Sequence, residues 1–127
     1  MANNNRPTSP HLQIYRLPLT AMLSILHRAT GALLSAGLVI TVLFLVALAD
    51  GQSSWEVAQG ILGNWFGLLV LFGFSLVLNY HMCNGIRHLF WDIGHGYTLE
   101  AASRANMIVL VTTVVLTVAV WIVALAA

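Results

Sequence analysis

The residues of this chain best suited to chemistry are its histidines, because a neutral imidazole is a good axial ligand for haem iron. There are five of them: His11, His27, His81, His88 and His95. His81, Gly85 and His88 are spaced by four and three residues, so they share one face if a helix runs through all of them. A glycine one turn from a histidine leaves room for a flat ligand against the backbone. This spacing is therefore compatible with a haem bound at His81.

A second polar group lies before the first long apolar stretch. Ser24 and Arg28 are four residues apart and share a helix face, and His27 directly precedes the arginine. An arginine can pair with a carboxylate, including a haem propionate. If the first and second apolar stretches form antiparallel helices, this group and His81 lie at a similar depth.

Each of these residues also has an explanation without a ligand. A histidine at a membrane interface is more often an ordinary anchor than a ligand. Arg87 and His88 could extend to the lipid headgroups. His11 and His95 lie in polar or glycine-rich surroundings, where we expect them to be solvated.

The elements that must position these residues follow from the composition. Of the 127 residues, 59% are hydrophobic and only 7% are charged, against about 25% charged in a soluble domain. The net charge is +1, with no lysine and no run of basic residues, so nucleic-acid binding is not expected. The single cysteine, Cys83, excludes an internal disulfide. The polar start predicts no cleavable signal peptide, and the lack of an Arg- and Ser-rich transit peptide favours a bacterial chain or a processed organellar one.

Three stretches without charged residues are long enough to cross a membrane, at about 29–49, 62–82 and 105–127. Backbone groups must be paired inside lipid, and the chain is too short to close a barrel, so the spans are predicted to be helices. An amphipathic inner-face segment, residues 1–28, precedes them. Pro10 and Pro18 indicate that it is not one unbroken helix. The predicted fold is an all-α membrane-anchor domain over residues 1–127, forming part of a heteromeric helical bundle.

The arginines predict the orientation. All five lie before the first span or around the second loop, whereas the first loop, 50–60, carries Asp50 and Glu56 and no arginine. The positive-inside rule predicts an N-terminus in the cytoplasm (or the mitochondrial matrix) and a C-terminus on the outer side. We expect a bacterial inner membrane, with a periplasmic C-terminus, rather than a mitochondrial one. The spans carry no chain of carboxylates, so proton pumping is not expected.

Two stretches resemble a known family. Residues 6–15 (RPTSPHLQIY) with 24–31 (SILHRATG), and residues 80–92 (YHMCNGIRHLFWD), are similar to two signatures of the succinate dehydrogenase cytochrome b556 family of respiratory complex II. The form of the first signature resembles the alphaproteobacterial and mitochondrial branch, which favours ubiquinone. The likeness extends over nearly the whole chain.

The resemblance implies roles for particular residues. His81 would be an axial ligand of haem b, with the other ligand from a companion small membrane subunit. His27 and Arg28 would lie near the haem propionates, and His88 near the haem. Ser24 and Arg28 would line the ubiquinone site. FAD and the iron–sulfur clusters would belong to a flavoprotein subunit and an iron–sulfur subunit, and no independent catalysis is expected of this chain.

Several alternatives stay open from the sequence. One is an anchor without haem, in which the histidines only shape the docking surface. Another is an unrelated small transporter subunit or membrane scaffold. A third is a menaquinone-linked anchor of a fumarate reductase. Depth alone also permits a haem ligated within this chain by His27 and His81 together.

Overall fold

The computed structural model of the chain describes residues 16–126. Most of the predicted inner-face segment lies outside these residues, as do Arg6, His11 and residue 127 of the third predicted span.

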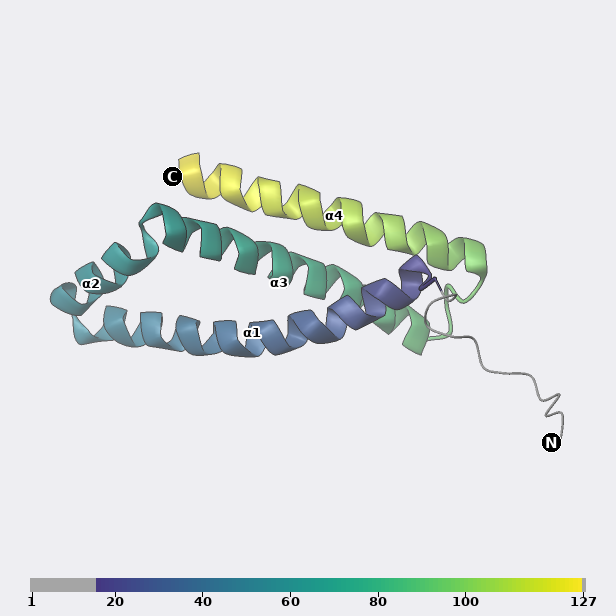
Figure 1. The fold of residues 1–127 in the computed structure, drawn as a ribbon, viewed down its shortest axis with the longest axis horizontal. Coiled ribbons are helices and arrows are strands. Elements are labelled where there is room, and N and C mark those ends of the chain that lie inside the picture. Colours follow the sequence, from purple (N-terminus) through teal and green to yellow (C-terminus); the bar gives the residue numbers. More distant parts are fainter. Residues whose placement is uncertain (1–15, 127) are drawn as a thin grey trace, which may run out of the picture.

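Within residues 16–126 the chain forms four helices: α1 (Leu19–Asp50), α2 (Gln52–Leu62), α3 (Trp65–Asp92) and α4 (Leu99–Ala126). The helices α1, α3 and α4 are long and apolar enough to cross a membrane. α1 and α3 run antiparallel, α4 returns along α3, and the short α2 connects α1 to α3 at the far end (Figure 1). The other end of the bundle carries Arg16, Arg28, Arg87 and Arg104, and is called here the arginine end.

The helices extend beyond the predicted spans. α1 begins at Leu19 instead of residue 29, so Ser24, His27 and Arg28 lie inside the first helix. Pro18 has extended backbone angles, and its carbonyl accepts hydrogen bonds from the amides of Ala21 and Met22. A proline at this position starts a helix without losing a needed donor.

The second span also differs from its predicted bounds. Residue 62 ends α2, and α3 begins three residues later at Trp65. Asn64 caps α3, because its side-chain oxygen accepts hydrogen bonds from the amides of Phe66 and Gly67 at 3.0 and 2.9 Å. The first loop is itself mostly helical, since α2 fills it. Gly51 separates α1 from α2 with a φ of +119°, a conformation that favours glycine.

Polar side chains hold the helices together. Among the described residues, Asn84, Asn106, Thr113 and Thr117 are buried although they lie on apolar helices. Asn79 on α3 donates to the hydroxyl of Thr117 on α4 at 3.0 Å. Lipid tails are as apolar as a leucine side chain, so burying apolar side chains between helices gives no hydrophobic gain in a membrane. Membrane helices are therefore held together by close packing and hydrogen bonds. Many large apolar side chains point away from the other helices, and most of those on α1 are exposed.

The strongest of these connections joins α1, α3 and α4 at the arginine end. Arg87 on α3 is only 4% exposed and donates to the side-chain oxygen of Asn106 on α4. Asn106 in turn donates to the hydroxyl of Thr20 on α1 at 2.8 Å. The guanidinium also lies over the ring of Trp91, 4.6 Å from its centroid. Arg87 therefore does not extend to the headgroups, and that alternative is wrong for this residue.

We predict that Asn106→Leu destabilises the protein by about 2 kcal/mol, because it leaves the buried Arg87 guanidinium without its oxygen partner. Thr113→Val is the matched control. The Thr113 hydroxyl donates only within its own helix, to the carbonyl of Val109, so its loss should cost less than about 0.5 kcal/mol. Thermal unfolding in detergent measures both. Equal losses would contradict the role given to Asn106.

Candidate functional site

Three of the predicted histidines come together where α1 and α3 cross at the arginine end. The imidazole rings of His27 on α1 and His81 on α3 are stacked, with centroids 4.0 Å apart and planes at 16°. The ring of His88, two turns further along α3, lies 5.1 Å from that of His27. All three side chains are half-buried. The expectation that α1 and α3 bring His27 and His81 to a similar depth is confirmed.

A glycine lies at each of these helix contacts, and the contact at Gly31 is the tighter one. A Cβ atom on Gly31 of α1 would lie 3.2 Å from Cε1 of His81, and one on Gly85 of α3 would lie 3.7 Å from Cε1 of His27. Each imidazole thus lies over a glycine of the opposite helix. The glycine predicted to leave room for a flat ligand, Gly85, is instead covered by the ring of His27.

One hydrogen bond fixes the ring of His81. Its Nδ1 lies 3.0 Å from the hydroxyl oxygen of Thr30 on α1, and Thr30 is 7% exposed. The second ring nitrogen, Nε2, remains available to a ligand. The Nδ1 atom of His27, by contrast, is buried and has no hydrogen-bond partner among the described residues.

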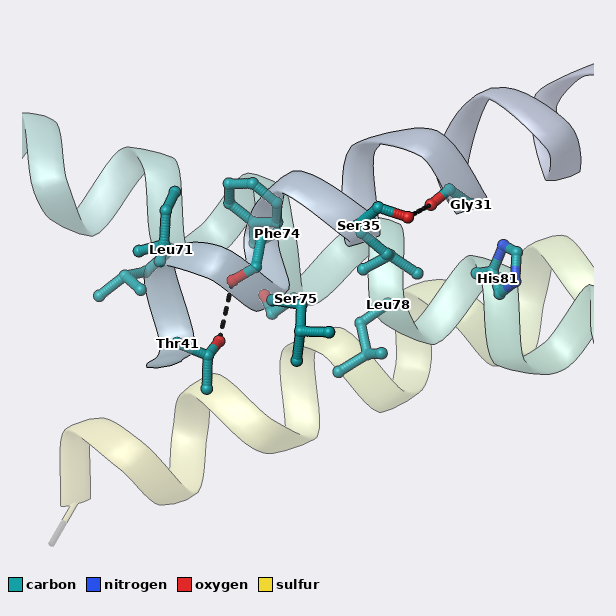
Figure 2. Close-up of a pocket in the computed structure, with 12 residues that line it drawn as sticks. Gly31, Ser35, Thr41, Leu71, Phe74, Ser75, Leu78 and His81 are labelled. Atoms are coloured by element: carbon teal, nitrogen blue, oxygen red, sulfur yellow. Dashed lines mark hydrogen bonds between the residues drawn. The ribbon is translucent and has the colours of Figure 1, made fainter. Parts of the chain in front are cut away.

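A groove of about 620 Å³ runs from His81 along the joint surface of α1 and α3. Figure 2 shows Gly31 and His81 at one end of it and Thr41 and Leu71 towards the other. The remaining lining is formed by Leu34, Ser35, Gly37, Leu38, Ile40, Phe74, Ser75 and Leu78. The groove is therefore apolar for most of its length, with a single imidazole at the arginine end.

The structure does not join Ser24 and Arg28 to the histidines by hydrogen bonds. Ser24 is half-buried and Arg28 is exposed, one turn apart on α1. Within residues 16–126 neither side chain forms a hydrogen bond. Both are thus free to face a substrate or another subunit. His95, predicted to be solvated, is exposed.

The stacking of His27 on His81 argues against a haem ligated by both residues. Iron binds an imidazole nitrogen in the plane of the ring, and two rings in face-to-face contact leave no space for a macrocycle between them. The part of the chain that the structure describes also contains no group of three or more His, Cys, Asp or Glu side chains placed to hold a metal ion.

The sequence interpretation missed three polar contacts of the site. Thr30 was part of a quoted motif but received no role. Its spacing of three residues from His27 was the available signal, because it places both on one helix face. Tyr80 and Asn84 were also missed: both donate to the carbonyl of Leu23, at 2.7 and 3.5 Å, and so hold α3 against α1 beside the histidines.

Known proteins match this chain over nearly its whole length. The family model for the succinate dehydrogenase/fumarate reductase transmembrane subunit matches residues 2–120. The chain belongs to this family. A succinate dehydrogenase cytochrome b556 subunit from Paracoccus denitrificans is 42% identical over 114 residues, covering 90% of this chain and 88% of the relative.

Other relatives come from bacteria and mitochondria. The cytochrome b556 subunit of Rickettsia typhi is 40% identical over 119 residues, covering 94% of this chain and 93% of the relative. The mitochondrial succinate dehydrogenase cytochrome b560 subunit of Sus scrofa is 41% identical over 113 residues, covering 87% of this chain and 67% of the relative. The family resemblance stated from the two motifs is therefore confirmed, as is the transmembrane α-helical fold.

Replacing Gly31 tests its contact with His81. Gly31→Ala places a methyl group 3.2 Å from Cε1 of His81 and should cost about 1 kcal/mol by overpacking. Gly73→Ala is the control, because no described side chain lies within 4 Å of the added methyl group. Thermal unfolding of the detergent-solubilised complex should show a lower midpoint for the first variant only. Equal midpoints would mean that the histidine moves aside freely.

Proposed function

We propose that this chain is a membrane anchor subunit of a succinate:ubiquinone oxidoreductase that provides one axial ligand of haem b and part of the ubiquinone-reduction site. Membership of the succinate dehydrogenase/fumarate reductase transmembrane family supports the anchor role. The relatives' designation as cytochromes supports the haem. The observation that carries the ligand assignment is His81, whose Nδ1 is hydrogen-bonded to Thr30 at the end of an apolar groove.

The described residues fit a haem. The groove is long, apolar and open on one side. Next to His81 it is lined by Gly31, which has no side chain to fill the space. A haem carries four metal donors of its own, so one imidazole from this chain is enough on this side. When bound, it would supply a one-electron carrier close to the quinone. The second axial ligand would come from a companion membrane subunit packed against the exposed face of α1 and α3.

The propionates are assigned to the arginine end of the groove. His27 has a buried Nδ1 that lacks a partner among residues 16–126, and Arg28 follows it with an exposed guanidinium. Both can donate hydrogen bonds to a carboxylate. His88, which contacts the ring of His27, would support this end from α3.

Ser24 and Arg28 are assigned to the quinone. They lie one turn apart near the start of α1, at the arginine end, on either side of His27 in the sequence. Their hydroxyl and guanidinium groups would donate hydrogen bonds to the quinone oxygens and stabilise the negative charge that develops there on reduction. The flavoprotein and iron–sulfur subunits, which would supply the electrons and hold FAD and the iron–sulfur clusters, would dock at this end.

We propose that the arginine end faces the cytoplasm of a bacterial cell, with α2 and the C-terminus on the periplasmic side. All four described arginines lie at the arginine end, and the segment from Asp50 to Asn64 at the opposite end carries none. The positive-inside rule assigns the end that carries the arginines to the cytoplasm.

Replacing His81 tests the haem assignment. In the purified complex we expect His81→Ala to lose the reduced b-type absorbance band, because one axial ligand is removed. His95→Ala is the control, since His95 is exposed and outside the groove. Retention of the full band in His81→Ala would refute the assignment. A wild-type complex without any haem would favour an anchor without haem.

Replacing Ser24 or Arg28 tests the quinone assignment. Ser24→Ala and Arg28→Ala should each slow succinate-driven ubiquinone reduction by about tenfold or more, because a hydrogen-bond donor to the developing charge is lost. Succinate oxidation with an artificial soluble acceptor should be unchanged. Arg104→Ala, an exposed arginine paired only with Glu100 among the described residues, is the control. Equal loss in both assays would count against the quinone role.

A further inference from the structure

The hydroxyl group of Thr30 makes two contacts. Its oxygen lies 2.9 Å from the carbonyl oxygen of His27, one turn earlier on α1, and 3.0 Å from Nδ1 of His81 on α3. A hydroxyl has one proton to donate, so it can donate to only one of these two atoms. The carbonyl oxygen of His27 can only accept.

Two arrangements of protons are therefore possible. If Thr30 donates to the carbonyl of His27, its oxygen must accept a hydrogen bond from a protonated Nδ1 of His81. The lone pair of a neutral imidazole then lies on Nε2, where it can bind a metal. If Thr30 donates to Nδ1, the ring proton lies on Nε2 and that nitrogen is blocked. Only the first arrangement leaves Nε2 of His81 available as a ligand.

We propose that Thr30 is a positioning residue for His81, which fixes the ring in the tautomer that presents Nε2 to the haem iron. This inference rests on the proposed haem ligation. The ring is held on its other sides as well, by the stacked ring of His27 at 4.0 Å and by Gly31 against Cε1. Thr30 supplies the only side-chain hydrogen bond that His81 makes within residues 16–126.

This hydrogen bond has a consequence for the haem. A ligand imidazole that donates its second N–H to an acceptor becomes more basic. A more basic axial ligand stabilises the more positively charged, oxidised iron, so it lowers the reduction potential. Removing the acceptor should therefore raise the haem midpoint potential. A residue that only filled space would not produce this shift.

The experiment compares Thr30→Val with Thr30→Ser in the purified complex. Valine keeps the shape of the side chain and lacks the hydroxyl, whereas serine keeps the hydroxyl and lacks the methyl group. We expect the redox titration of Thr30→Val to show a higher haem midpoint potential than wild type, together with altered low-spin signals in the electron paramagnetic resonance spectrum. Thr30→Ser should match wild type in both. Unchanged values in Thr30→Val, or equal shifts in both variants, would overturn the proposal.

Two further variants keep the test decisive. If Thr30→Val does not assemble, Thr30→Ala removes the hydroxyl without a branched side chain, and the same outcomes apply to it. His81→Ala separates this inference from the proposed function. A haem that is lost in His81→Ala and unaltered by loss of the Thr30 hydroxyl would overturn the role of Thr30 alone. A haem that survives in His81→Ala would overturn both.

Discussion

The site depends on a reciprocal contact between α1 and α3, in which each helix provides a glycine for an imidazole of the other. His81 lies over Gly31, and His27 lies over Gly85. This arrangement allows the two rings to stack at 4.0 Å and brings the Thr30 hydroxyl within hydrogen-bond distance of His81. A Cβ atom on Gly31 would crowd the ring of His81 at 3.2 Å, whereas one on Gly85 would lie at ordinary contact distance from His27, 3.7 Å.

The apolar surroundings explain why many polar side chains of this bundle are paired, although Nδ1 of His27, Oδ1 of Asn84 and two guanidinium nitrogens of Arg87 are buried without a partner among the described residues. A buried donor or acceptor in lipid has no water to bind, so its partner must come from a neighbouring helix. Tyr80 and Asn84 use the carbonyl of Leu23, and Arg87 uses Asn106. These connections stiffen the arginine end. The opposite end has mainly apolar contacts, with α2 as a cover between α1 and α3.

The sequence was sufficient for the class of fold and for the histidine cluster. Charge-free stretches and helical spacing are local properties, so they predicted three spanning helices and a shared depth for His27 and His81. The helix starts were not predictable from hydropathy, because Pro18 and Asn64 decide them through backbone geometry and capping. The burial of Arg87 was also missed. Its partner Asn106 lies 19 residues away on another helix, and local sequence patterns do not predict a pairing between two helices.

The central claim is that His81 presents Nε2 to a haem in the groove between α1 and α3 while Thr30 holds Nδ1. An experimental structure of the intact complex with its membrane subunits, at a resolution that shows side chains and cofactors, tests this most directly. The account predicts a haem seated against Gly31, with Nε2 of His81 on the iron and the Thr30 hydroxyl on Nδ1. A groove filled by lipid or by a partner helix, with the iron ligated by any other residue of this chain or by none, would contradict it.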